Sequence, residues 1–345
     1  MNVPGGRWRL LIPVVLLAFA GAMIWWRGPD WHAVGHAFTR VRWAWVVAAI
    51  GLNLASVIAR AACWNTTIRQ AMPKPRLSFG LVFSAFCVGL LANVVIPGRV
   101  GELARVAVLV RRVPTRQRAW GNLIGSVVAH RMFDLFPVIA LVIAVLLTAG
   151  LPHWALVSLA VVLGISAVLF VAVVLAARQQ NKPLGAEHGT IRNLVAQTRA
   201  GLAIMRAPGP AATAAGFQSL GWFCQLLAVW SAMRAFNIHQ PIEIAALVLV
   251  LMNVATIFPL WPGNVGLLQA AIALPLRPYG VPYGKGFAFG IGLQAIEASV
   301  GVGIGLVFLA REGLSLATLR EMPQQAADAE SQSEERERAR AGVSG

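Results

Sequence analysis

Long apolar runs separated by short polar connectors make up most of this chain. Runs of roughly 20 apolar residues match the length of a helix that crosses a bilayer. Two shorter apolar pieces, at 100–110 and 265–276, each follow a run that ends in a Pro-Gly pair. The pattern predicts an all-α polytopic membrane protein. The long runs fall near residues 10–26, 43–59, 77–96, 121–149, 154–177, 212–236, 244–261 and 286–310.

The composition agrees with a membrane protein and excludes a soluble one. Of the 345 residues, 58% are hydrophobic and only 12% are charged, whereas soluble domains carry roughly 25% charged residues. The net charge of +16 is explained by cytoplasmic loops rich in Lys and Arg. Because the chain has no soluble basic domain, nucleic acid is excluded as a partner.

Basic residues flank the region 77–110 on both sides, which decides its predicted topology. Both flanks are cytoplasmic by the positive-inside rule, and one full span cannot start and end on the same side. The region is therefore predicted to be a re-entrant hairpin, broken at Pro97 and Gly98. The basic residues are Arg60, Arg69, Lys74 and Arg76 before it, and Arg99, Arg105, Arg111, Arg112, Arg116 and Arg118 after the apolar run at 77–96.

The same reasoning makes 244–276 a second hairpin, which enters from the outside, returns to it and is broken near Pro262. The prediction is six full spans plus two re-entrant hairpins, with both termini cytoplasmic. Eight full spans remain the alternative, because the outer loop at 27–42 carries Arg27, Arg40 and Arg42.

An internal repeat supports the two hairpins. The stretch "PGRVGEL" at 97–103 matches "PGNVGLL" at 262–268 at an offset of 165 residues, and the same offset superimposes the neighbouring runs. Two halves, about 43–149 and 212–314, then run in opposite directions, which is an inverted repeat of the kind found in membrane transporters. The transmembrane domain is predicted over 1–320, with a cytoplasmic basic loop at 178–211. The polar tail at 321–345 is predicted to be disordered.

Each break would leave free backbone N–H groups and the positive end of a helix dipole inside the membrane, where an anion can bind. A purely structural kink, closed by neighbouring helices, is the alternative. The predicted hinge residues are Pro97, Gly98, Gly101, Pro262, Gly263 and Gly266.

Charged residues follow the first break at a spacing of three. Arg99, Glu102 and Arg105 therefore share one helix face, and Glu102 can pair with either arginine. The remaining positive charge suits an anionic head group, although an ordinary ion cluster at the membrane interface would give the same pattern.

Further polar residues lie inside apolar spans. His130 and Arg131 both have helical spacing to Asp134, so both pairs can form on one face, where they would either hold the hairpin or line a path. Glu297 is the lone acid of the last span, and is either functional or a hydrogen-bonded structural group. Candidate head-group ligands near the breaks are Asn93, Asn253, Asn264 and Gln269.

Recognisable catalytic motifs are missing from the sequence. It has no P-loop, no zinc-type spacing and no nucleophile elbow. We therefore expect no enzyme activity, no cofactor and no metal.

The motif set resembles a known family. The stretch "NVVIPGRVGELARVAVLVRR", followed by "HRMFD" and later by "PGNVG", is similar to the flippase-like membrane region of lysylphosphatidylglycerol synthases, including stand-alone and hopanoid-biosynthesis-associated relatives. The specific element is Gly-Glu-Leu-x-Arg, here Gly101 to Arg105. The family often has Glu where this chain has His130, and a Glu after the second glycine motif where it has Leu267 or Gln269.

The resemblance implies a lipid transporter of the bacterial inner membrane that binds an anionic or aminoacylated lipid head group between the two hairpins. Membrane lipids are the implied partners, and oligomers are left open. The full synthases add a soluble aminoacyl-transferase domain, which is not expected here. The competing interpretation is a non-transporting accessory protein that serves an enzyme of lipid or hopanoid synthesis.

Overall fold

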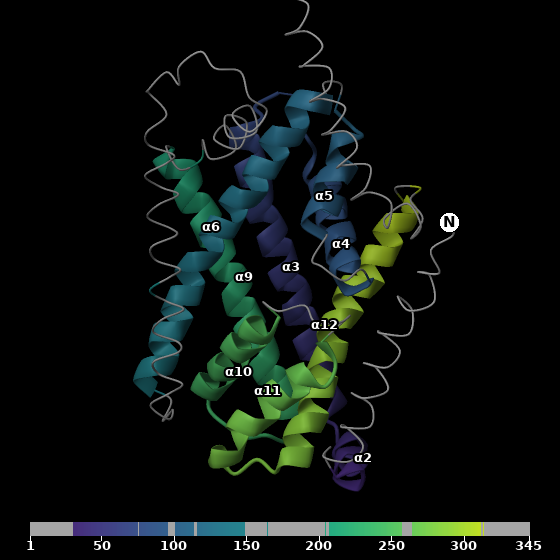
Figure 1. Cartoon of the computed structure of the whole chain (residues 1–345), viewed down its shortest axis with the longest axis vertical. Coiled ribbons are helices and arrows are strands. Elements are labelled where there is room, and N and C mark those ends of the chain that lie inside the picture. The colour runs from purple at the N-terminus through teal and green to yellow at the C-terminus, as the bar shows by residue number, and fades with distance from the viewer. Residues whose placement is uncertain are drawn as a thin grey trace, which may run out of the picture.

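The chain folds into a bundle of helices (Figure 1). The computed structural model describes residues 30–74, 76–95, 101–113, 116–148, 207–256 and 264–311, together with 164, 204 and 313, and within these residues it contains no strand. The helices are α2 Trp31–Thr39, α3 Trp43–Ala71, α4 Phe79–Val95, α5 Gly101–Val110, α6 Arg116–Thr148, α9 Pro208–Ala235, α10 Ile242–Ala255, α11 Leu267–Leu276, the short 3-10 helix η4 Arg277–Tyr279 and α12 Tyr283–Arg311.

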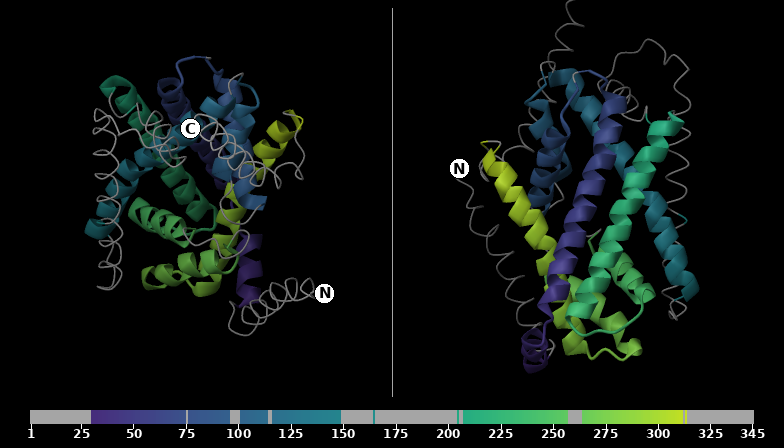
Figure 2. Two further views of the ribbon diagram at one scale, coloured as in Figure 1. Left: turned by 45° about the horizontal axis from the view of Figure 1, so that its top comes forward. Right: turned by 180° about the vertical axis from the view of Figure 1, so that it is seen from behind.

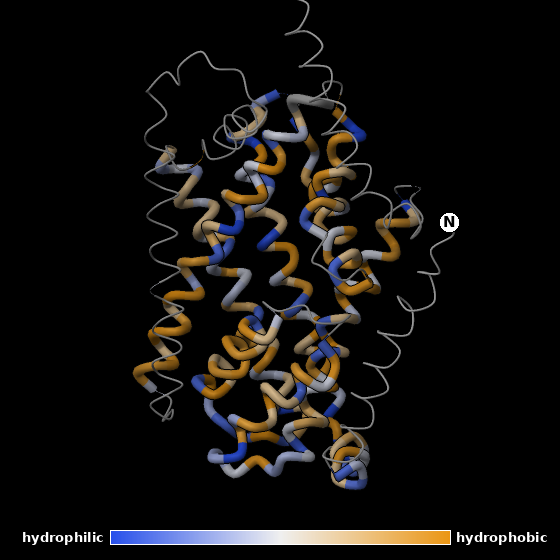
Figure 3. The backbone as a smooth tube through the Cα atoms, in the orientation of Figure 1, coloured by the Kyte–Doolittle hydropathy of each residue, from blue (hydrophilic) through white to orange (hydrophobic). Residues whose placement is uncertain are grey.

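Among the described residues, three helices are long and apolar enough to cross a membrane: Trp43–Ala71, Ala119–Thr148 and Tyr283–Arg311. Two shorter apolar helices, α4 and α10, accompany them. Figure 3 shows hydrophobic positions along most of each helix. These features confirm an all-helical membrane protein, while the number of spans stays a prediction. Apart from 164 and 204, the expected spans at 10–26 and 154–177, the loop at 178–206 and the tail at 321–345 lie outside the described residues.

Helices α3 and α9 form the most extensive helix pair and run antiparallel. The start of α3 meets the end of α9, where the Arg42 backbone N–H donates to the Ala235 carbonyl oxygen at 2.9 Å. The end of α3 lies beside the start of α9 (Figure 2). The two helices begin at residues 43 and 208, an offset of 165. The first turn of α9 occupies part of the predicted basic loop, because Pro208 suits the first position of a helix.

The prediction for the end of the 43–59 span is wrong. Helix α3 continues to Ala71, so Arg60 and Arg69 lie inside the helix rather than in a cytoplasmic loop. No proline interrupts this stretch before Pro73. The expected outer loop at 27–42 also contains a helix, α2, whose start is capped by Asp30: its side chain accepts from the backbone N–H of His32 at 2.9 Å.

Two pairs of short helices occupy opposite ends of the bundle. In Figure 1 the α4/α5 pair lies in the upper half and the α10/α11 pair in the lower half. Helix α12 packs against both pairs. Helices α4 and α5 approach so closely that a Cβ atom at Gly101 would overlap the carbonyl oxygen of Gly89. Small residues permit such close packing of membrane helices.

Candidate functional site

Charged and polar side chains from α3, α5, α6, α9 and α12 gather inside the bundle. Glu102 of α5 makes the first link between two of these helices. It forms one ion pair with Arg105 of its own helix and a second with Arg131 of α6. The spacing of three residues predicts the first pair, whereas the second joins residues 29 positions apart in the chain. Glu102 therefore pairs with two arginines at once.

Arg105 is buried by aromatic rings as well as by its ion pair. The residue is only 3% exposed. Its guanidinium lies over the Trp64 ring of α3, 4.5 Å from the ring centroid, and 5.4 Å from the centroid of Phe86 of α4. A desolvated cation–π contact of this kind contributes about 2 kcal/mol. Through these contacts Arg105 links its own helix, α5, to α3 and α4.

Asp134 is the second connection between helices. It forms an ion pair with Arg131 at 3.0 Å, as the sequence spacing predicts. Its Oδ1 atom also accepts a hydrogen bond from Trp222 Nε1 at 2.8 Å and one from the Gln218 amide, both on α9. Asp134 therefore accepts from three donors, and the two on α9 join that helix to α6.

The predicted pair between His130 and Asp134 is wrong. The His130 ring packs edge-on against Phe86, with 5.9 Å between the ring centroids. Neither of its ring nitrogens has a hydrogen-bond partner among the described residues. The α9 donors and Arg131 occupy the Asp134 carboxylate instead.

Arg60 completes the site from α3, and sequence reasoning missed it. Its guanidinium lies over the Trp222 ring at 4.9 Å. Helix α9 can come this close because Gly221 has no side chain: a Cβ atom there would lie 2.8 Å from Arg60 Cγ. At the repeat offset, Arg60 corresponds to Gln225, which donates from Nε2 to Glu297 Oε1 at 2.6 Å.

A signal in the sequence could have identified the α9 residues. Gln218, Trp222 and Gln225 recur at i, i+4 and i+7, so they line one face of a helix. Polar side chains on one face of a membrane helix face protein or water rather than lipid. Their charged partners lie on other helices, and that pairing has no signature in the local sequence.

The amide side chains predicted near the second break do not join the charged network. They lie around α10 and α11. Asn253 Nδ2 donates to the Leu249 carbonyl at 2.8 Å. Asn264 Nδ2 donates to the Ala255 carbonyl at 3.0 Å. Gln269 accepts from the Gly266 backbone N–H at 2.6 Å and donates to Gln294 Oε1 at 2.5 Å.

On the first half, Asn93 Oδ1 accepts from the Gly101 backbone N–H at 2.9 Å. Both glycines predicted as hinges and described here, Gly101 and Gly266, thus start a short helix with a bonded N–H. The remaining predicted site and hinge residues lie outside the described residues: Pro97, Gly98, Arg99, Pro262 and Gly263.

Within the described part of the chain, the site is balanced in formal charge but unequal in exposure. These residues include three arginines, Arg60, Arg105 and Arg131, and three carboxylates, Glu102, Asp134 and Glu297. The Arg131 side chain is 50% exposed, compared with 25% for Glu102 and 13% for Asp134. The pair of Arg131 and Glu102 is therefore its most accessible part.

This fold and this site define a polytopic α-helical membrane protein with a charged network buried inside its bundle. The chain matches the lysylphosphatidylglycerol synthase TM region over residues 8–305 and belongs to that family. The family resemblance seen in the sequence is confirmed.

One curated relative adds to this finding. A UPF0104 membrane protein of Pyrococcus horikoshii is 24% identical over 168 residues, which are 48% of this chain and 48% of the relative. The chain thus aligns with about half the length of that relative. No solved structure matches the chain.

Proposed function

We propose that this protein moves an amphipathic lipid across the membrane by admitting its head group to the charged network between the two halves. The acyl chains stay in the surrounding bilayer. Family membership and the network both support this proposal. The protein carries the lipid and makes no covalent change to it.

The exposure of Arg131 is the observation that carries the proposal. Helix α6 covers residues 116–148, so Arg131 lies near its midpoint. A charge at the centre of a membrane helix costs at least about 2.5–3.5 kcal/mol when it faces hydrocarbon. A half-exposed guanidinium is stable there only if it faces water or a polar head group.

The balanced charge of the network favours a head group that itself carries both charges. A phosphate would bind Arg131, which presents a planar pair of donors. An ammonium group, such as that of an aminoacyl or ethanolamine head group, would bind the carboxylate of Glu102. Such a ligand replaces one ion pair with two and leaves no buried charge unpaired.

The α4/α5 and α10/α11 pairs are proposed to be re-entrant hairpins that bring this polar path toward the midplane. Their placement at opposite ends of the bundle and the common offset of 165 support an inverted repeat. The short lengths of α4, α5, α10 and α11 agree with helices that turn back before crossing the bilayer.

Lipid translocation in reconstituted vesicles tests the proposal. With fluorescent phosphatidylethanolamine as the probe, Arg131→Ala is expected to slow translocation by about tenfold or more, because a charge-assisted contact of roughly 1.5–3 kcal/mol is lost. Arg131→Lys should recover only part of the rate. Arg234→Ala is the matched control, since Arg234 lies over Trp230 at 4.7 Å and outside the network.

Thermal stability measured on the same proteins separates transport from packing. A stable Arg131→Ala protein that translocates at the rate of the unchanged protein would contradict the proposal. That result would favour the accessory role, in which the network is purely structural.

A further inference from the structure

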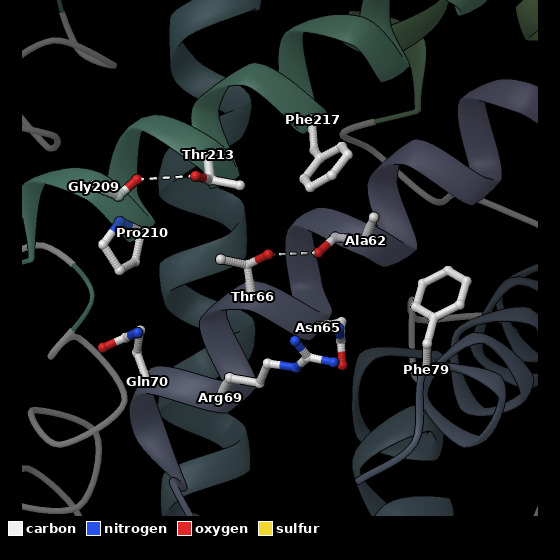
Figure 4. Close-up of a pocket in the computed structure, with 10 residues that line it drawn as sticks. All are labelled: Ala62, Asn65, Thr66, Arg69, Gln70, Phe79, Gly209, Pro210, Thr213 and Phe217. Carbon is white, nitrogen blue, oxygen red and sulfur yellow. Dashed lines mark hydrogen bonds between the residues drawn. The ribbon is translucent and has the colours of Figure 1, made fainter. Parts of the chain in front are cut away.

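A second polar site lies on the outer face of the α3/α9 pair, away from the charged network. It is a pocket of about 650 Å³ near the end of α3 and the start of α9. Figure 4 shows side chains from both helices and from the start of α4 around it. The lining residues are Ala62, Asn65, Thr66, Arg69, Gln70, Phe79, Gly209, Pro210, Thr213 and Phe217.

Helix geometry separates this pocket from the network. Residues 62, 65, 66 and 69 are three or four apart and share one face of α3. Arg60 and Trp64, which contact the network, share another face of the same helix. The pocket and the network are thus two sites on the two sides of α3.

Arg69 gives the pocket a preference for an anion. Its side chain is exposed, and no ion pair joins it to an acid among the described residues. None of the lining residues is acidic. A guanidinium with free donors matches the planar, two-pronged geometry of a phosphate.

Asn65 adds a second, independent requirement. The residue is only 8% exposed, and its Oδ1 atom has no hydrogen-bond partner among the described residues. A buried acceptor without a donor costs about 1–3 kcal/mol. The hydroxyl groups of Thr66 and Thr213 cannot supply the donor, since both already donate to the carbonyls of their own helices, at 2.9 and 3.0 Å.

Apolar rings complete the pocket. Phe79 and Phe217 are 38% and 37% exposed, so part of each ring is open at the pocket. They offer apolar surface to the acyl chains of a lipid beside the polar groups that would bind its head group. A soluble phosphate ester would leave these rings uncovered.

We propose that this pocket binds the head group of a membrane phospholipid that is not the transported one. The lipid phosphate binds Arg69, and the Asn65 side chain turns toward the pocket so that its Oδ1 atom, which is closed off without the lipid, accepts from a head-group N–H or O–H. The acyl chains start along Phe79 and Phe217. Bound in this way, the lipid joins α3 to α9 from the outside. The proposal is independent of the transport function.

Lipid binding to the purified protein, followed by native mass spectrometry, tests the site. Phosphatidylethanolamine carries a phosphate and an N–H donor, whereas phosphatidylcholine carries a phosphate and no donor. The unchanged protein is expected to bind the first about tenfold more tightly, the effect of one charge-assisted hydrogen bond. Arg69→Ala should weaken binding of both lipids about tenfold. Asn65→Ala should abolish the preference between them.

Three controls keep the result specific. Lys74→Ala removes an exposed positive charge close by in sequence and should change neither affinity. Every measurement is repeated in an Arg131→Ala background, where binding should persist because the network is not involved. Soluble glycerophosphoethanolamine should not compete, because it has no acyl chains.

The proposal is overturned if neither lipid binds saturably, if Arg69→Ala binds as the unchanged protein does, or if Asn65→Ala keeps the preference for phosphatidylethanolamine. Equal losses in Lys74→Ala and Arg69→Ala would also overturn it, since they would indicate nonspecific surface charge. Competition by the soluble ester would point to a small phosphate ester as the ligand and contradict a lipid site.

Discussion

The α4/α5 and α10/α11 pairs, which the sequence repeat is predicted to relate at an offset of 165 residues, carry different chemistry. Helix α5 contributes Glu102 and Arg105 to the charged network. At the offset of 165, the corresponding positions of α11 are Leu267 and Ala270. Helix α5 thus supplies two charged side chains, whereas the polar side chains around α10 and α11 are neutral amides. The sequence similarity at this offset therefore does not extend to the charged residues of α5.

In both pairs, however, an amide side chain accepts from a glycine backbone N–H at the start of the second helix. Short helices leave their first N–H groups without partners, which is costly inside a membrane. The Gly101 N–H is bonded by Asn93 from the neighbouring helix α4, and the Gly266 N–H by Gln269 from within α11. Both halves use an amide side chain for the same task, from different positions in the chain.

The largest expected loss of stability comes from breaking the ion pair between Glu102 and Arg105. Glu102→Gln leaves Arg105 buried without a counter-charge and should lower the free energy of unfolding by about 3 kcal/mol. Glu243→Gln at the start of α10 is the matched control and should cost about 0.5 kcal/mol through the helix dipole. Detergent unfolding titrations measure both. Equal values would mean that α5 is no more dependent on charge than α10.

Close packing gives the next effect. Gly101→Ala places a Cβ atom against the Gly89 carbonyl and should cost about 2 kcal/mol by overpacking. Gly80→Ala, in open space on α4, should be neutral or slightly stabilising. Melting temperatures of the two variants check the expectation. An unchanged Gly101→Ala protein would show that α4 and α5 do not approach this closely.

The shared use of an amide as acceptor can be tested by removing each amide. Asn93→Leu and Gln269→Leu should each cost about 1.5 kcal/mol, because each leaves a glycine N–H without its acceptor. Gln269→Leu should leave lipid translocation close to normal, since Gln269 does not contact the charged network. If it abolished translocation in a stable protein, the second half would have to contribute directly to transport.

The smallest effect is expected at Glu297. Glu297→Gln keeps an oxygen acceptor for the Gln225 amide and removes only the charge, so stability should change by less than about 1 kcal/mol. Glu297→Leu removes the acceptor as well and should cost more. Thermal unfolding of the two variants separates the contribution of the hydrogen bond to stability from that of the charge. A larger loss in Glu297→Gln would assign a structural role to the charge itself.

Hydrophobic length predicted most helices well. The expected pieces at 77–96, 100–110, 265–276 and 286–310 agree with α4, α5, α11 and α12 within a few residues. The end of α3 was mispredicted because Arg60 looked like the start of a loop. In the fold its charge lies against Trp222, so the helix continues past it.

The site was predictable only where its partners are close in sequence. Glu102 with Arg105, and Arg131 with Asp134, follow from helical spacing. The bonds from α9 to Asp134 join residues more than 80 positions apart. Helical spacing also wrongly paired His130 with Asp134, because it cannot show that closer donors already surround the carboxylate.

The contacts of Asp134 and Glu102 join different helices of the bundle. Trp222 and Gln218 of α9 both donate to Asp134 of α6, so two hydrogen bonds hold α6 and α9 together. The link from this pair to Glu102 on α5 is made by Arg131, whose side chain is half exposed. Under the proposed transport function, a head group that competes for Arg131 breaks the link to α5 and leaves both hydrogen bonds between α6 and α9 in place. Ligand binding would then be felt first by the α4/α5 pair.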